Sequence, residues 1–207
     1  MTVAVDVVDA TDRRPVFVVV QFRDREERQF AGVRLIPFLV EQQVVTVRRV
    51  GEHVVVGLHL ATLNGGERSM LAVLDRPVCR QFEFVAVAPS AGPLIEVLDA
   101  RGIRRVPLQL RDGDDKRLPR DVVCENLRCA IADVSPQIVH ANSLSMGRLT
   151  GAVADRISVP TIAHLRDILK LSRAAVDDLN RNRLSIAVSE ATRDFHIAQH
   201  LNAEQTR

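Results

Sequence analysis

VVVGLHLATLNGGERSMLAVLD, residues Val54 to Asp75, is the stretch that decides the fold. It begins with an apolar, β-branched run and ends with apolar residues at helical spacing. Gly65 and Gly66 stand between the two patterns. Because a glycine inside a helix costs about 1 kcal/mol relative to alanine, the pair predicts a close approach to the backbone at the start of the helix. We therefore expect a strand, a glycine turn and a helix in succession.

The same alternation continues from residue 53 to residue 207. Apolar strand patterns occupy 54–60, 82–88, 103–110, 137–141, 159–165 and 184–189. Helical patterns occupy 65–75, 93–102, 118–136, 143–156, 168–183 and 190–200. Near-continuous apolar strands separated by helices are typical of a parallel sheet covered on both faces. The sequence predicts an α/β, Rossmann-like fold with strand order 3-2-1-4-5-6, in which Pro107 makes the third strand short or places it at an edge.

Residues 1–52 do not follow this alternation. The runs VFVVVQF and QQVVTVRR look like strands, but no helical pattern separates them. Three alternatives stay open for this segment: extra strands of the main sheet, a small β appendage, or poor order. We expect two parts, an N-terminal extension of uncertain structure at 1–52 and a Rossmann-like domain at 53–207.

The composition excludes several classes of partner. The chain has 207 residues, of which 46% are hydrophobic and 26% charged, and its net charge is +2. That balance is ordinary for a globular protein and gives no reason to expect nucleic acid. No apolar run reaches the roughly 20 residues of a membrane helix, and the first residues lack the basic region of a signal peptide. The expected location is the cytoplasm, or peripheral at the inner face of the membrane.

Polar residues gather where the predicted strands end. Asn142 follows the fourth strand, His164 lies at the end of the fifth with Arg166 and Asp167 after it, and Ser189 lies at the end of the sixth. Parallel strands end at one edge of the sheet, where folds of this type bind ligands, so we expect these residues to line one cleft. Loops attract polar residues in any case, and a single histidine at a strand end is more often structural than catalytic.

The glycine pair favours a phosphate. Backbone N–H groups and the partial positive charge of the helix start would face a diphosphate beside Gly65 and Gly66. The alternative is a turn that needs positive φ. The spacing is neither GxGxxG nor a Walker A loop, which disfavours a dinucleotide. DGDD, residues 112–115, contains a DxD that binds metal in some sugar transferases, but it is typical of a solvated turn, and no metal site is expected.

Five segments together resemble family 4 glycosyltransferases, which have the GT-B fold. LNGGERSML resembles the glycine loop after their first strand, and APSAGPLIEVLDARGI is similar to their second strand and helix. DVSPQIVHANS, VPTIAHLRD and IAVSEATRDF are similar to three later segments of the family, in the same order. The resemblance covers Val54 to Arg207. One departure is that Glu67 follows Gly66 directly, where the family usually has an alanine.

The resemblance implies a hexosyltransferase that uses a nucleotide sugar, retains the anomeric configuration and needs no metal or further cofactor. It implies that Gly65 and Gly66 approach the donor diphosphate and that His164 lies near the transferred sugar as the catalytic residue. Asn142, Arg166, Asp167 and Ser189 are the other expected substrate-binding residues. The expected partners are a sugar nucleotide and a glycan, lipid or small-molecule acceptor.

The family has two Rossmann-like domains, and this sequence ends where the second, donor-binding one is expected. The sequence therefore predicts the acceptor-side domain, which folds but does not transfer sugar without the C-terminal domain. Two alternatives stay open. One is a non-catalytic Rossmann-like binding module, and the other is half of a GT-B sugar-nucleotide epimerase.

Overall fold

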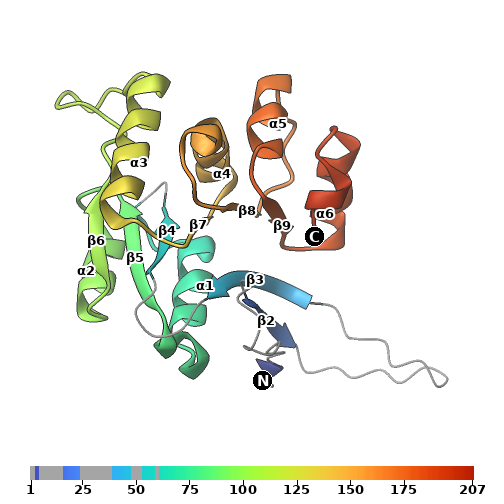
Figure 1. Cartoon of the computed structure of the whole chain (residues 1–207), viewed down its shortest axis with the longest axis horizontal. Coiled ribbons are helices and arrows are strands. Elements are labelled where there is room, and N and C mark those ends of the chain that lie inside the picture. Colours follow the sequence, from blue (N-terminus) through green and yellow to red (C-terminus); the bar gives the residue numbers. More distant parts are fainter. Residues whose placement is uncertain (1–2, 5–15, 24–38, 48–52, 59–60) are drawn as a thin grey trace.

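The computed structural model describes residues 3–4, 16–23, 39–47, 53–58 and 61–207. Its main feature is a six-stranded parallel sheet (Figure 1). The strands are β4 (His53–Gly57), β5 (Glu83–Ala88), β6 (Arg104–Pro107), β7 (Ile138–Ala141), β8 (Thr161–Leu165) and β9 (Leu184–Ala187). They lie in the order β6-β5-β4-β7-β8-β9, which confirms the predicted order 3-2-1-4-5-6. As predicted, the strand with Pro107 is short and lies at an edge.

Helices cover both faces of this sheet (Figure 1). The α-helices are α1 (Gly65–Leu74), α2 (Pro93–Ala100), α3 (Arg120–Val134), α4 (Leu144–Val153), α5 (Arg173–Asn180) and α6 (Glu190–Ala198). Short 3₁₀ turns lie at η1 (Pro77–Gln81), η2 (Ala154–Arg156) and η3 (Ala203–Gln205). In Figure 1, α1 and α2 lie on one side of the strands, and α3, α4 and α5 lie on the other.

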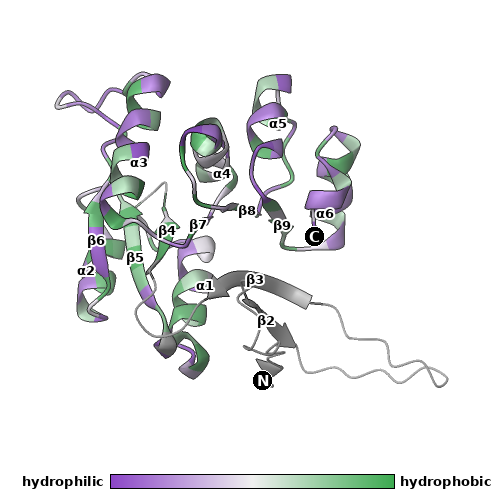
Figure 2. Ribbon diagram, viewed as in Figure 1, coloured by the Kyte–Doolittle hydropathy of each residue, from purple (hydrophilic) through white to green (hydrophobic). Residues whose placement is uncertain are grey.

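The alternation of buried side chains along the strands explains this layering. Val54 and Val56 pack with side chains of α1 and α2, whereas Val55 between them packs with α3 and α4. Successive side chains of a strand point to opposite faces, so a strand that is apolar at every position needs cover on both. Figure 2 shows mainly hydrophobic residues on α2, a hydrophilic start and a hydrophobic later part on α1, and mixed faces on α3 and α5. The fold is therefore the predicted Rossmann-like α/β sandwich.

Two glycines bring α4 very close to its neighbours. A Cβ on Gly147 would lie 2.7 Å from Cβ of Ala163 in β8, and a Cβ on Gly151 would overlap the backbone carbonyl oxygen of Asp178 in α5. The buried side chain of Asn182 adds a hydrogen bond to the Gly147 carbonyl oxygen at 2.8 Å. No other residue type fits these two positions without moving backbone.

The N-terminal segment forms a separate antiparallel sheet of three strands. They are β1 (Val3–Ala4), β2 (Val16–Arg23) and β3 (Leu39–Val47), and β2 pairs with both of the others. The two strand-like runs of the sequence are thus strands. The proposed division of the chain at residues 52 and 53 stays a prediction.

One expectation about the elements was wrong. The helix predicted from residue 168 begins at Arg173 instead, because the Ser172 hydroxyl accepts a hydrogen bond from the Ala175 N–H and caps it there. The Gln199 side chain holds the segment before the helix, since it donates to the Leu169 carbonyl oxygen and accepts from the Leu171 N–H. His164, expected at the end of its strand, lies within β8.

Candidate functional site

The sheet reverses its winding between β4 and β7. From β4 the chain moves outward through β5 and β6, then returns to build β7, β8 and β9 on the other side. Loops on either side of such a switch point diverge, which leaves a crevice at the carboxyl ends of the two central strands. The α1 start follows β4 and Asn142 follows β7, so both predicted segments meet at this point.

Helix α1 begins at the glycine pair with its first turn well ordered. The backbone N–H of Asn64 donates to the Glu67 carboxylate at 3.1 Å, and the Asn64 side chain donates to the Thr62 hydroxyl at 3.1 Å. These contacts fix where the helix starts. A Cβ on Gly65 would meet nothing within 4 Å, so the Gly65 backbone faces open space. Neither glycine of the pair is among the glycines with positive φ, which removes the turn explanation.

Gly66, Asn142 and Arg166 form one contact cluster across the switch point. The buried Asn142 side chain donates to the Gly66 carbonyl oxygen at 3.1 Å. The Arg166 guanidinium donates to the Asn142 side-chain oxygen at 3.0 Å and to its backbone carbonyl oxygen at 3.2 Å. A Cβ on Gly66 would lie 3.2 Å from Cδ of Arg166. Gly66 therefore leaves room for an arginine side chain, and Asn142 fixes that arginine beside the start of α1.

Two buried histidines lie next to this cluster. His140 of β7 and His164 of β8 stack with ring centroids 5.6 Å apart, and His164 has no exposed surface. Burial, and then the positive charge of Arg166, lower the pKa of His140 to about 4 and that of His164 well below its ordinary value. Within the described part of the chain, neither ring nitrogen of His164 has a hydrogen-bond partner. Both imidazoles are therefore neutral at pH 7, and His164 reaches no open surface in this arrangement.

Asp167 and Ser189 have local structural roles. The Asp167 carbonyl oxygen lies 2.8 Å from Nε2 of the buried His196, which ties the loop after β8 to α6. The Ser189 hydroxyl accepts a hydrogen bond from the Thr192 N–H at 3.1 Å and caps α6. Ser143 similarly caps α4. The structure thus brings Gly66, Asn142 and Arg166 into contact, whereas the contacts of Ser189 are with its own helix.

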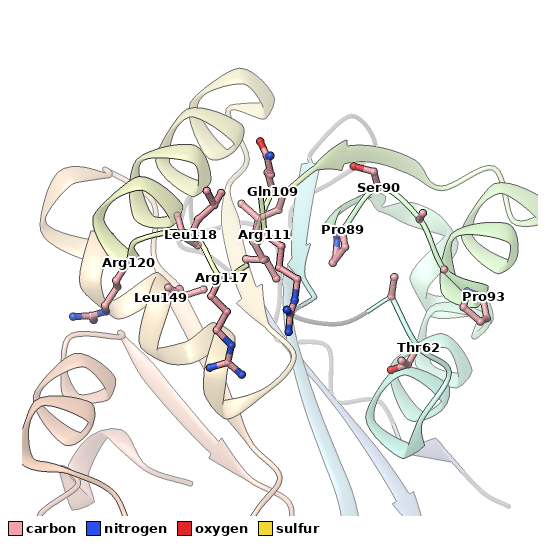
Figure 3. A pocket seen from close by; sticks show the side chains of 16 residues that line it. Thr62, Pro89, Ser90, Pro93, Gln109, Arg111, Arg117, Leu118, Arg120 and Leu149 are labelled. Atoms are coloured by element: carbon pink, nitrogen blue, oxygen red, sulfur yellow. The ribbon is translucent and has the colours of Figure 1, made fainter. Parts of the chain in front are cut away.

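A pocket of about 600 Å³ opens at the same edge of the sheet, on the β5 and β6 side (Figure 3). Its lining comes from the loops after β4, β5 and β6, the starts of α2 and α3, and Leu149 of α4. Apolar side chains such as Leu108, Leu118 and Leu149 lie beside the side chains of Arg111, Arg117 and Arg120. The volume is typical of a small-molecule site. A second hollow of about 390 Å³ lies at the opposite, amino ends of β5 and β6.

Two arginines of the pocket, Arg111 and Arg117, come from a hairpin that the sequence did not reveal. Arg111 and Arg117 pair as antiparallel neighbours, and the Leu118 N–H donates to the Leu110 carbonyl oxygen at 3.0 Å. The Asp112 carboxylate accepts hydrogen bonds from the backbone N–H groups of Asp114 and Lys116, which closes the turn. The acidic run at 112–115 thus shapes a turn, as expected. Its register, which sets the two arginines opposite each other, is invisible in a pattern of strands and helices.

The comparisons with known proteins rest on structure. No protein-family model and no curated protein sequence matches the chain. Among solved structures, Anabaena Alr3699/HepE in complex with UDP superposes with a TM-score of 0.60 at 17% identity, over 75% of this chain and 43% of that one. The apo form of the lipopolysaccharide outer core galactosyltransferase WaaB gives 0.54 at 12%, over 75% and 44%. UDP-GlcNAc 2-epimerase from Neisseria meningitidis, bound to UDP-GlcNAc, gives 0.53 at 10%, over 74% and 44%.

These likenesses define the fold. They confirm a Rossmann-like domain that corresponds to one half of a GT-B structure. The chain spans less than half the length of each of these proteins. Among the helices that the structure describes, none is long and apolar enough to cross a membrane.

Proposed function

We propose that this chain is the acceptor-side, N-terminal domain of a nucleotide-sugar-dependent glycosyltransferase that resembles family 4. The observation that carries the proposal is the contact cluster of Gly66, Asn142 and Arg166 at the switch point. It places a fixed guanidinium beside an open helix start, two features that both favour an anion. The structural likeness to HepE bound to UDP and to the galactosyltransferase WaaB supports a sugar nucleotide as that anion.

The chemistry follows from where charge develops. When the sugar leaves its nucleotide, negative charge builds up on the diphosphate, and preorganised donors that face it lower the barrier. The backbone at Gly65 and the guanidinium of Arg166 would supply such donors, so we propose transfer without a metal. We further propose retention of the anomeric configuration, the default of the family that the sequence resembles. His164 remains our candidate for the residue near the sugar; the structure supports a neutral imidazole there.

A sugar-nucleotide epimerase is the second candidate, because UDP-GlcNAc 2-epimerase has a similar fold. Both candidates would use a nucleotide sugar as substrate. They differ in the fate of the sugar, which an epimerase returns to the nucleotide and a transferase passes to an acceptor.

The test uses the full-length natural protein that contains these residues. Labelled UDP-glucose and UDP-GlcNAc are incubated with and without a membrane extract as the source of acceptors, and the products are separated. We expect UDP release and label in a non-nucleotide product only with the extract. Label that stays in the nucleotide fraction as an isomer of the donor would establish the epimerase, and no consumption of any sugar nucleotide would refute both.

The matched variants are Gly65→Ala and Gly113→Ala. A Cβ on either glycine meets no protein atom within 4 Å, so neither change should lower the melting temperature. Only Gly65 faces the proposed diphosphate. Gly65→Ala should therefore weaken donor binding at least about tenfold, which corresponds to 1.4 kcal/mol of lost contact, whereas Gly113→Ala should not. Equal donor affinity for both variants would remove the glycine turn from the site.

A further inference from the structure

We propose that the pocket beside the hairpin binds an acceptor that carries a phosphate group, and that Arg111 and Arg117 hold this phosphate. The inference rests on the proposed function, because it names the chemical class of the acceptor for the same domain. It begins from the pocket of about 600 Å³, which lies at the carboxyl edge of the sheet next to the proposed donor site. The two sites share the loop between β4 and α1, since Thr62 lines the pocket and accepts a hydrogen bond from Asn64 at the start of α1.

The register of the hairpin sets two positive charges side by side. Arg111 and Arg117 are direct neighbours across its two strands, so their side chains leave the same face. Figure 3 shows both side chains extending from the hairpin in the same direction. Like charges directly opposite each other on a hairpin are destabilising unless an anion lies between them. This arrangement gains stability when a phosphate binds.

The three arginines of the pocket differ in their partners. Arg120 donates to the buried carboxylate of Asp178 at 2.5 Å, so it is committed to joining α3 to α5. Arg111 donates to the Asp115 carbonyl oxygen at 2.6 Å and forms a longer ion pair, at 3.5 Å, with the exposed carboxylate of the same residue, which a bound phosphate could replace. The Arg117 side chain makes no hydrogen bond or ion pair with any residue in the described part of the chain. Arg111 and Arg117 are therefore the pair that can bind a ligand.

Two features of the pocket favour phosphate over other ligands. Guanidinium groups match the geometry of phosphate oxygens with paired hydrogen bonds. The helices α2 and α3 both begin at the pocket, at Pro93 and Arg120, and their starts add positive potential. The apolar side chains of Leu108, Leu118 and Leu149 lie beside the arginine pair, so the group next to the phosphate has room to be hydrophobic.

The test measures binding of three probes to the 207-residue chain by calorimetry and by NMR of the pocket residues. The probes are glycerol 3-phosphate, n-octyl phosphate and the uncharged n-octyl glucoside. We expect both phosphates to bind, with an affinity that falls as salt is raised. Tighter binding of octyl phosphate would indicate a lipid source for the phosphate, and equal binding a soluble one; both outcomes support the proposal. Binding of octyl glucoside as tightly as octyl phosphate would overturn it.

The decisive variant is the double substitution Arg111→Gln with Arg117→Gln, and its control is Arg104→Gln. Arg104 is an exposed arginine at the amino end of β6, on the far edge of the sheet from the pocket. The double variant should bind phosphate roughly tenfold to a hundredfold more weakly, the range for lost hydrogen bonds between charged groups. The control should bind like the wild type, and all forms should keep the same melting temperature. Unchanged phosphate affinity in the double variant would refute the proposal.

The two proposals fail in different ways. If the protein transfers sugar to an acceptor without phosphate, and the double variant does so at the same rate, the glycosyltransferase proposal is supported and the phosphate site is refuted. If phosphate binding depends on the arginine pair but the protein consumes no sugar nucleotide, the phosphate site is supported and the glycosyltransferase proposal is refuted.

Discussion

Arg166 controls the charge around the switch point. Asn142 holds its guanidinium through two hydrogen bonds, and Gly66 has no side chain to displace it. From there the cation acts in two directions. It would offer positive charge to the ligand proposed at the start of α1, and it helps to keep His140 and His164 unprotonated. A neutral imidazole near the sugar would accept a hydrogen bond or a proton but would not repel a cationic transition state.

The buried histidines predict how stability depends on pH. In the unfolded chain an imidazole has its ordinary pKa of about 6.5, whereas burial lowers the pKa of His140 to about 4 in the folded state. Between these values the unfolded state binds more protons, so the free energy of unfolding should fall as the pH drops from about 6.5 to 4. At 1.36 kcal/mol for each pH unit, His140 alone contributes a loss of roughly 3 kcal/mol, and His164 adds to it in the same direction.

Urea unfolding at several pH values between 7 and 4.5 measures this loss. His140→Phe keeps a ring in the stack but cannot bind a proton, so this variant should lose less stability on acidification than the wild type. His200→Asn is the control, because His200 is exposed and asparagine tolerates its positive φ. An identical pH dependence in the wild type and the His140 variant would show that this imidazole does not titrate as its burial requires.

Among the helix pairs that the structure describes, α4 and α5 make the most extensive contact. Gly151 lies against the backbone of Asp178, whose carboxylate accepts from Arg120 at the start of α3. Three helices on one face of the sheet are thus linked through a single residue of α5. Arg148 of α4 adds a longer ion pair to the same carboxylate at 3.8 Å.

Gly151→Ala should destabilise the protein. Its Cβ would overlap the Asp178 carbonyl oxygen, and backbone cannot move aside unless α4 and α5 separate. Overpacking of this kind costs about 1–3 kcal/mol, and a clash with backbone belongs at the upper end. Thermal and urea unfolding measure the change, with Gly113→Ala as the matched control of near-zero cost. A Gly151 variant as stable as its control would show that the two helices are not packed as described.

At the scale of the whole molecule, the chain spans less than half the length of the solved structures it resembles. This length affects what catalytic activity we expect from the chain by itself. The six-stranded sheet has helices and an apolar core on each face, which is enough for a domain to fold. Transfer requires that donor and acceptor be held together in one water-poor cleft. Positioning of that kind contributes about 7–11 kcal/mol to lowering a barrier.

The 207-residue chain by itself should therefore fold but not transfer sugar. In this chain we propose only the glycine pair, the start of α1 and nearby arginines as contacts for the donor. Because association costs at least about 4 kcal/mol, we expect millimolar affinity for the sugar nucleotide at best. Calorimetry with UDP-glucose and UDP-GlcNAc, together with a transfer assay on the same sample, measures both quantities. Micromolar donor affinity or turnover by this chain would show that this half alone supplies a complete donor site.

The sequence by itself determined the sheet. Val54, Val55 and Val56 are apolar on both faces, which only a strand covered by helices on both sides satisfies. Short crossovers of one hand then leave few strand orders, and the predicted one is observed. The sequence also predicted that Asn142 and Arg166 lie close together, because residues that follow parallel strands meet at one edge of the sheet, and the two are in contact.

Only the tertiary structure decided which side chains of the sheet and its loops are buried, and which residues they contact. Burial of His164 depends on what packs over β8, and the start of α5 depends on Gln199, which lies far along the chain. Arg111 and Arg117 lie opposite each other because of the register of the hairpin, which no periodic sequence pattern predicts. Local sequence sets which backbone conformation each segment prefers, whereas these contacts join residues that become neighbours only after the chain has folded.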